Sequence, residues 1–225
     1  MRLSSPNALE LRYVKDMMAW LLFLAPPLNI VQLGLGAASL TKYSLAYCKP
    51  SHVTVVELNR IVILATQAWF KLRYDHPRLT VVHADAEKYL KQANPHLYPN
   101  VLQVDVYDAA AKGPVLDSPS FYADCFKSMG GHEGVPGVAV FNFFGSDHFV
   151  RSRERVAKVF GGKIVQLPKC KEGNIVVLAF GGPDLRLNIS DLTARAAMLE
   201  AKFNLPANEW LAAIQSPANR WVLSP

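Results

Sequence analysis

Two aspartates, Asp105 and Asp108, follow an apolar run that the sequence predicts as a strand over Asn100–Val104. Open α/β sheets bind their ligands at the carboxyl ends of strands, and this pair would lie at such an end. Carboxylates beside an apolar strand are costly unless they are paired or used. We therefore interpret the pair as part of a functional site. The small residues of 109–114 that follow are suited to a loop that covers a ligand.

A second part of this site is predicted at Gly34 and Gly36, which directly follow the apolar run Ile30–Leu33. A strand, a tight glycine turn and a helix form the unit that brings a nucleotide close to the backbone. Gly34 would allow the sharp turn, and Gly36 would remove a Cβ where a ligand must approach. An ordinary turn between a strand and a helix is the alternative interpretation.

Two further acids, Glu57 and Asp85, come at the ends of the next predicted strands. Glu57 lies 21 positions after Gly36, where an acid of a βαβ unit can accept hydrogen bonds from both hydroxyls of a ribose. Asp85, which precedes Ala86, is placed to accept a hydrogen bond from an adenine amino group. Each acid could instead cap the helix that follows it.

The elements that must position these residues alternate along the chain. A first helix is predicted over Pro6–Phe23, with Ser5 as its cap and Pro26-Pro27 after its end. Seven strands are predicted, and the last two form a hairpin: Ile30–Leu33, Val53–Glu57, Leu79–Val82, Asn100–Val104, Val138–Phe144, Gly162–Leu167 and Asn174–Phe180. Helices are expected between the strands, at Ile61–Tyr74, Ala86–Lys91, from Ser118 onward and at Asp147–Phe160, and in the tail at Ser190–Gln215. This order predicts an α/β fold, a three-layer sandwich around a mostly parallel seven-stranded sheet with one antiparallel strand.

Length and composition predict one domain over residues 1–225, with an N-terminal helix segment at 1–27 and C-terminal helices at 185–225. The formal net charge is +6, but the basic residues are scattered and form no recognisable nucleic-acid-binding motif, so no nucleic acid partner is expected. The three cysteines are far apart, which favours reduced thiols in the cytoplasm and neither a disulfide framework nor a metal site. The most apolar run, at 17–24, is too short to span a bilayer, which needs about 20 residues. No membrane association is therefore expected.

Several motifs in order resemble the spermidine synthase family of polyamine aminopropyltransferases, within the class I S-adenosylmethionine-dependent, Rossmann-like fold. They are Gly34-Leu-Gly36, Val55-Val-Glu57-Leu, Asp85-Ala86, Asp105-Val-Tyr-Asp108, Gly113-Pro114 and Phe121-Tyr122, and the segment from Tyr13 to Trp20 resembles the family's first helix. The resemblance covers about Leu9 to Phe180.

The resemblance implies a function and a set of site residues. It implies transfer of an aminopropyl group from decarboxylated S-adenosylmethionine to a small-molecule amine. In the co-substrate site Glu57 would hold the ribose, Asp85 and Ala86 would hold the adenine, and Gly34 and Gly36 would form the glycine turn. Asp105 would be the general base, and Asp108, Tyr107 and Tyr13 would bind substrate. The family needs no metal for this reaction.

The departures from the family pattern lie on the polyamine side of the implied site. Ala37 stands where the family has an aspartate that helps to bind the aminopropyl amine. Lys15 falls near a family glutamine, and Cys170, between two lysines, falls near a family tyrosine. A positively charged entrance to the site binds a dication such as putrescine poorly. These departures therefore favour a different acceptor. The sequence also begins close to the first helix, so the family's small N-terminal β-domain is expected to be absent.

Two other functions remain open at this point. The first is an S-adenosylmethionine-dependent methyltransferase, because the loss of the acid at Ala37 would leave room for the carboxylate of that cofactor. The second is a non-catalytic nucleoside-binding or assembly protein that keeps the fold. An NAD-dependent dehydrogenase fits poorly, since Ser39 stands at the third glycine of its fingerprint. A homodimer that uses part of the apolar first helix, with Trp20 and Phe23, is a further possibility.

Overall fold

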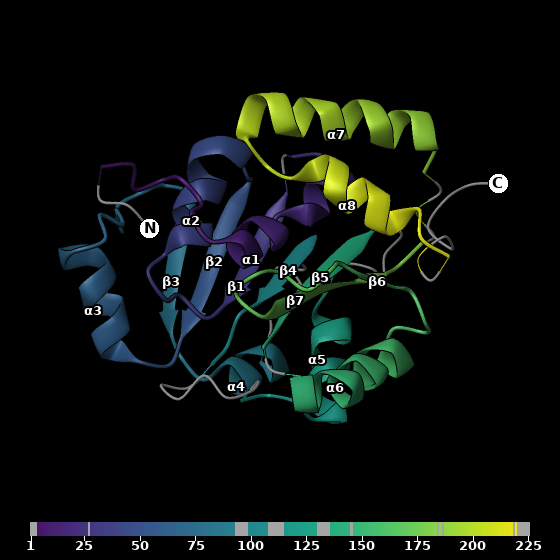
Figure 1. Ribbon diagram of the computed structural model, residues 1–225. Coiled ribbons are helices and arrows are strands. Elements are labelled where there is room, and N and C mark those ends of the chain that lie inside the picture. The colour runs from purple at the N-terminus through teal and green to yellow at the C-terminus, as the bar shows by residue number, and fades with distance from the viewer. Residues whose placement is uncertain are drawn as a thin grey trace.

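Seven strands form one sheet in the computed structural model, in the order β3-β2-β1-β4-β5-β7-β6 (Figure 1). Their bounds are β1 Asn29–Leu33, β2 His52–Glu57, β3 Leu79–His83, β4 Val101–Val104, β5 Gly137–Phe144, β6 Ile164–Gln166 and β7 Asn174–Gly181. The structure describes residues 4–26, 28–92, 99–107, 115–129, 136–144, 146–183, 185, 187–217 and 219, with the side chains of 146 and 147 left aside.

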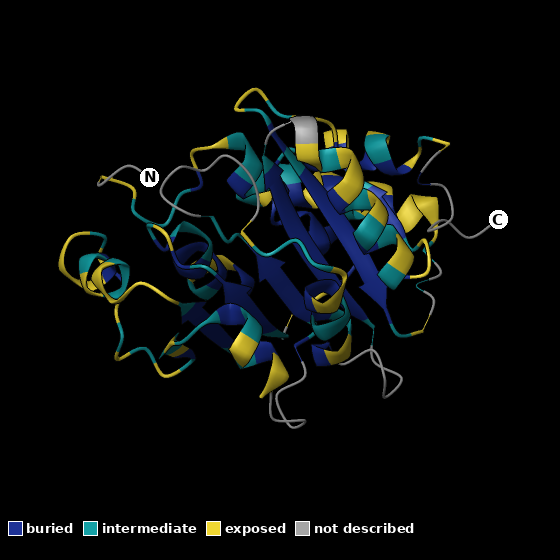
Figure 2. Ribbon diagram, turned by 90° about the horizontal axis from the view of Figure 1, so that it is seen from below, coloured by how far each residue is buried: buried dark blue, intermediate teal, exposed yellow. Residues whose placement is uncertain are grey.

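The predicted sheet is confirmed. Strands β1 to β5 pair in parallel, whereas β7 runs antiparallel to both of its neighbours, β5 and β6. The central strands read as continuous apolar runs because helices cover both faces of the sheet. Figure 2 shows these strands almost wholly buried between helices that expose only their outer sides.

Helices pack on the two faces as separate layers. Their bounds are α1 Arg12–Asp16, α2 Ser39–Tyr43, α3 Arg60–Ala68, α4 Ala86–Lys91, α5 Pro119–Ser128, α6 Ser146–Val159, α7 Ile189–Phe203 and α8 Ala207–Ile214, with a 3₁₀ helix η1 at Ala19–Leu22 and a π-helix η2 at Ser44–Cys48. One apolar cluster joins the sheet to α1, η1, α2, α7 and α8, and the other joins it to α4, α5 and α6. Figure 1 shows the same two groups on opposite sides of the sheet.

The prediction of one continuous helix over Pro6–Phe23 is wrong. The segment forms α1, a turn and then η1, and Ser5 caps neither of them. The break occurs because Leu21 N–H bonds to Met18 O, in 3₁₀ fashion, and leaves Met17 O without an α-helical partner. The side chain of Gln103 on β4 donates to that carbonyl at 2.8 Å. A buried side chain of the sheet therefore supports the carbonyl that the break releases.

The second half of this segment, from Asp16 to Leu24, is buried within the chain itself. Trp20 is fully buried and Phe23 is 4% exposed within this one chain. Among the exposed large apolar side chains, four lie on and beside α3, where Leu58, Ile61, Leu64 and Trp69 are 55–74% exposed.

Smaller differences concern helix lengths. The predicted helix Ile61–Tyr74 ends as α3 at Ala68, and Lys71 beyond it has a positive φ of 58°. The predicted C-terminal helices are α7 and α8, which are separated because Asn204 takes a left-handed conformation at the end of α7 and Pro206 precedes α8. Among the described residues, no helix is long and apolar enough to cross a membrane.

The glycine turn packs directly on the end of β4. A Cβ at Gly34, where φ is +94°, would lie 2.2 Å from the backbone oxygen of Asp105. A Cβ at Gly36, where φ is +50°, would meet nothing within 4 Å. The first glycine is therefore required by the packing of the protein itself, and the second faces open space, as the sequence interpretation expects of a position that a ligand approaches.

We expect Gly34→Ala to lower the free energy of unfolding by more than about 3 kcal/mol, because a backbone overlap adds to a strained φ that alone costs about 1–3 kcal/mol. Gly36→Ala is the matched control and should cost only about 1–2 kcal/mol, the penalty of a left-handed alanine. Urea unfolding of both variants measures the difference. Equal losses would contradict the assigned contact between Gly34 and Asp105.

Candidate active site

The predicted site residues come together because three neighbouring parallel strands end at the same edge. Gly34 N–H bonds to Val56 O at 2.8 Å, and Asp105 N–H bonds to Leu33 O at 2.9 Å. The glycine turn after β1 thus lies between the ends of β2 and β4, where Glu57 and Asp105 stand. This is the edge at which parallel α/β sheets bind ligands.

Glu57 ties the glycine turn to the end of β2. Its carboxylate accepts a 2.9 Å bond from Leu35 N–H and a 2.7 Å bond from Asn59 N–H. The capping residue of α3 is not Glu57 but Asn59, whose side chain accepts from Ile61 N–H. Glu57 is partly exposed, and each carboxylate oxygen can accept a second bond.

Asp85 caps α4, as one of the two sequence interpretations predicts. Its Oδ1 accepts from Lys88 N–H at 2.9 Å. Ala84 N–H bonds to Glu57 O, so the end of β3 lies next to that of β2. Asp85 therefore stands beside Glu57 on the same edge, and the adjoining Ala86 is 8% exposed. A contact of Asp85 with adenine stays a prediction.

Asp105 follows the end of β4 and is held there by an amide of the neighbouring strand. Asn142 on β5 donates from Nδ2 to Oδ1 of Asp105 at 2.8 Å. Burial raises the pKa of Asp105 above its ordinary value of 3.8, and the Asn142 bond acts in the opposite direction. Two tyrosines flank this carboxylate. Burial and the charge of Asp105 raise the pKa of Tyr107, whose hydroxyl donates to Asn142 O at 2.7 Å.

Tyr13 brings α1 to the same carboxylate. Burial raises the pKa of Tyr13 to about 12, with smaller contributions from Asp105, Glu172 and Cys170. The hydroxyl is thus a neutral hydrogen-bonding group at neutral pH, set between β4 and the loop that joins β6 to β7. Asp108, the second predicted aspartate, and the predicted covering loop at 109–114 lie outside the described residues.

Asn142 and Asn174 belong to the site but were not singled out from the sequence. Asn174 on β7 donates from Nδ2 to Asn142 Oδ1 at 2.9 Å, and both residues are buried. The available signal was an asparagine inside the otherwise apolar run Val138–Phe144, since a buried amide needs partners. The residue that supplies the hydrogen-bond partner of Asn142 depends on how β5 pairs with β7.

Two of the positions that depart from the family pattern, Lys15 and Cys170, line one groove. This groove, of about 390 Å³, runs between α1 and the β6–β7 loop, and Lys15, Lys169, Cys170 and Lys171 contribute to it. Arg12 binds two acids of the groove: it forms an ion pair with Glu209, and its backbone N–H donates to Glu172. Arg12 also forms an ion pair with Asp16.

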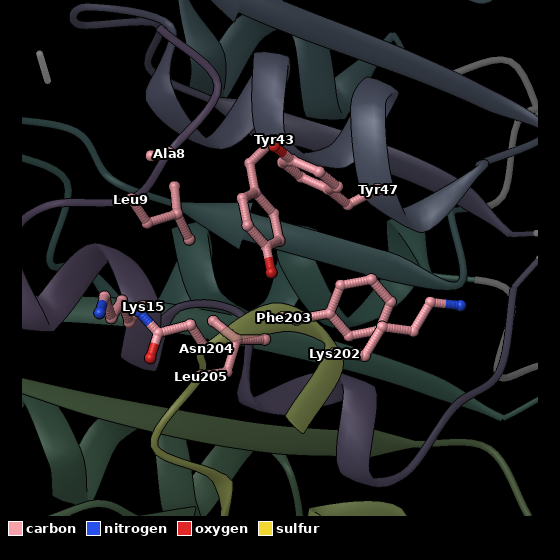
Figure 3. Close-up of a pocket in the computed structure, with 9 residues that line it drawn as sticks. All are labelled: Ala8, Leu9, Lys15, Tyr43, Tyr47, Lys202, Phe203, Asn204 and Leu205. Atoms are coloured by element: carbon pink, nitrogen blue, oxygen red, sulfur yellow. The ribbon is translucent and has the colours of Figure 1, made fainter. Parts of the chain in front are cut away.

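A second cavity, of about 240 Å³, lies on another side of Lys15 (Figure 3). Its walls come from the start of the chain, from α2 and η2, and from the end of α7. The aromatic rings of Tyr43, Tyr47 and Phe203 face one another in it, and Tyr43 and Tyr47 lie 4.9 Å apart between ring centroids. Of the described residues, no group of three or more His, Cys, Asp or Glu side chains is arranged to hold a metal.

The raised pKa of Asp105 gives a stability prediction. Between the unfolded pKa and the raised folded pKa the native state binds more protons, so wild-type stability falls as the pH rises through that interval. Asp105→Asn removes this loss of stability, and its side-chain oxygen can still accept the hydrogen bond from Asn142. We therefore expect this variant to be more stable than wild type at pH 7.

Urea unfolding at several pH values measures this effect, and the advantage of Asp105→Asn should vanish below about pH 3.9. The control is Asp75→Asn, because Asp75 is exposed and its pKa is lowered by Arg73. That variant should show no gain at pH 7. A destabilised Asp105→Asn at pH 7 would contradict the unfavourable burial of the carboxylate.

Comparisons with known proteins extend this picture. No protein-family model matches the sequence. The polyamine aminopropyltransferase of Neisseria meningitidis serogroup B is 30% identical over 218 residues, which are 96% of this chain and 81% of the relative. That of Chromobacterium violaceum is 30% identical over 212 residues, or 94% and 79% of the two chains. The chain thus spans about four-fifths of the length of these relatives.

Solved structures share the fold. Human methyltransferase-like protein 13 in complex with SAH has a TM-score of 0.69 at 18% identity, covering 92% of this chain and 94% of that one. Spermidine synthase from Thermotoga maritima has a TM-score of 0.67 at 19% identity, covering 92% and 72%. A spermidine synthase in complex with the transition-state analogue AdoDATO has a TM-score of 0.67 at 18% identity, covering 92% of this chain and 72% of that one. The fold alone is common to methyltransferases and spermidine synthases, whereas the sequence relatives agree in name and match nearly the whole chain, so the chain belongs to the polyamine aminopropyltransferase family of enzymes.

Proposed function

We propose that the protein transfers an aminopropyl group from decarboxylated S-adenosylmethionine to an amine. The observation that carries this proposal is the Asp105 carboxylate, which stands beside the glycine turn with its pKa raised and two tyrosines next to it. Family membership supports the reaction class, and the site supplies the group that this reaction needs.

The acceptor determines why a carboxylate is needed. An alkylammonium has an ordinary pKa of about 10.4, so it is almost wholly protonated at neutral pH and cannot attack. Asp105 would bind the ammonium and accept one of its protons. The nitrogen lone pair then forms a bond to the methylene next to the sulfonium, and the carbon–sulfur bond breaks with its electron pair going to sulfur. The leaving methylthioadenosine is neutral, so the remaining task of the protein is alignment.

The co-substrate would lie along the edge formed by β1, β2 and β3. We place its ribose at Glu57, whose oxygens keep acceptor capacity after their two backbone bonds. We place its adenine at Asp85 and Ala86, and its sulfonium next to Gly34 and Gly36. The open space at Gly36 supports this placement.

We propose that the acceptor differs from a simple dication. Ala37 supplies no carboxylate to the turn, and Lys15, Lys169 and Lys171 line the groove between α1 and the β6–β7 loop. These positive charges repel a dication. Tyr13, Tyr107 and Asp108 remain the proposed substrate-binding residues. A single cytoplasmic domain that acts on a small molecule completes the proposal, supported by the free thiols of Cys48, Cys125 and Cys170.

A methyltransferase is the second candidate, and one observation favours it: the absence of an acid at Ala37 would admit the carboxylate of S-adenosylmethionine. Calorimetric titration with methylthioadenosine and with S-adenosylhomocysteine separates the two functions, because these ligands differ only in the amino-acid tail on a common thioether. We expect methylthioadenosine to bind more tightly.

Glu57→Gln is the control for this titration. The change halves the acceptor capacity for ribose hydroxyls, so binding of both ligands should weaken by about tenfold, or about 1.4 kcal/mol. Tighter binding of S-adenosylhomocysteine would favour methyl transfer. If neither ligand bound, the chain would be better described as a non-catalytic member of the family.

The acceptor proposal predicts that Ala37→Asp alone leaves putrescine a poor substrate. One restored carboxylate does not remove the positive charges of the groove. The rate of methylthioadenosine release with decarboxylated S-adenosylmethionine and putrescine measures this, with wild type as the reference. Strong putrescine activity in Ala37→Asp would show that the acceptor has not changed.

A further inference from the structure

The amide of Asn142 can help Asp105 only in one of its two orientations. With Nδ2 toward the carboxylate it donates a hydrogen bond, as observed at 2.8 Å. With the amide turned over, Oδ1 would face an oxygen of Asp105, and two acceptors would repel each other. Some other group must therefore decide which end of the amide faces the carboxylate.

We propose that Asn174 is a positioning residue that fixes the amide of Asn142 so that it donates to Asp105. The inference rests on the proposed function, in which Asp105 is the base. Asn174 Nδ2 donates to Asn142 Oδ1 at 2.9 Å, which leaves only Nδ2 of Asn142 for the carboxylate. Asn142 and Asn174 are 5% and 7% exposed, so bulk water does not replace either bond.

The strand pairing explains why these two side chains meet. Asn142 on β5 is opposite Val176 on β7, and Asn174 lies two residues from Val176. Side chains two residues apart on a strand share a face, so Asn174 is the diagonal neighbour of Asn142. The backbone carbonyl of Asn142 also accepts the Tyr107 hydroxyl at 2.7 Å, which holds the residue on its second side.

Cys170, in the loop that joins β6 to β7, contacts Asn174 from the side opposite Asn142. The Cys170 thiol donates weakly toward Asn174 Oδ1 across 4.0 Å, and Cys170 N–H bonds to Asn174 O at 2.9 Å. Burial raises the pKa of Cys170, so the group is a thiol, a donor, at neutral pH. The backbone hydrogen bond from Cys170 holds Asn174 at the start of β7, from where its Nδ2 reaches Asn142.

Removal of Asn174 should raise the pKa of Asp105. Without its partner, the Asn142 amide can turn, and Asp105 loses an ordered donor that stabilises its ionised form. The titratable groups of the described elements that interact electrostatically with Asp105 are Tyr13 on α1 and Tyr107 after β4, and Tyr13 also interacts with Glu172 and Cys170. Neither tyrosine changes its charge near the pH at which a carboxylate titrates, so the shift would report the amide.

The test is a carbon-13 NMR titration of full-length protein labelled at its aspartate carboxyl groups, with Asp105→Asn to identify the Asp105 signal. Asn174→Leu keeps the branched shape and the number of non-hydrogen atoms, Asn174→Ala shortens the side chain, and both remove the amide. We expect the pKa of Asp105 to rise by about one unit in each. Asn142→Leu should produce at least the same shift, and the double variant with Asn174→Leu should add nothing, because Asn174 acts through Asn142.

The control is Asn219→Leu, another buried asparagine, which bonds to carbonyls of Ala213 and Gln166 and not to this group. It should lower stability without moving the pKa of Asp105. An unchanged pKa in both Asn174 variants, or shifts of Asn142 and Asn174 variants that add, would overturn the inference. The titration needs no substrate, so a shift as expected in a protein that fails to transfer aminopropyl groups would refute the proposed function and leave the role of Asn174 intact.

Discussion

The candidate site depends on one constraint. The Asp105 carboxylate is largely removed from water and accepts a hydrogen bond from one amide. Burial favours the protonated form of Asp105, and the Asn142 bond favours the ionised form. The balance of the two keeps a base available that is stronger than an exposed aspartate. Reaching that balance requires α1, β4, β5 and β7 to meet at one point, because each contributes a residue to the group around the carboxylate.

The sheet that brings these elements together was predictable, since buried parallel strands read as continuous apolar runs between turn residues. The ends of those strands also pointed to Glu57, Asp85 and Asp105 as candidate site residues, because an acid near the end of an apolar strand is visible in the sequence alone. The bonds of Glu57 to Asn59 and of Asp85 to Lys88 then follow from local geometry, whereas the bond of Glu57 to Leu35 joins residues 22 apart in the chain.

Other features depend on contacts between distant residues and could not be predicted in this way. The break between α1 and η1 depends on Gln103, which is 86 residues from the carbonyl it supports. The pair of Asn142 and Asn174 depends on the register of two antiparallel strands, and each asparagine alone looks like an isolated polar residue in an apolar run. The local hydrophobic periodicity predicts the strands well. It contains no information about which distant side chains will form hydrogen bonds with one another.

The anchoring of α1 also has a consequence for synthesis of the protein. Asp16 accepts a hydrogen bond from Trp210 Nε1, and Leu22 O accepts one from Arg195, across 194 and 173 residues of chain. A ribosome releases the N-terminal apolar segment first and the helices that cover it last. The two hydrogen bonds that hold this segment to α8 and α7 can therefore form only after most of the chain has been made.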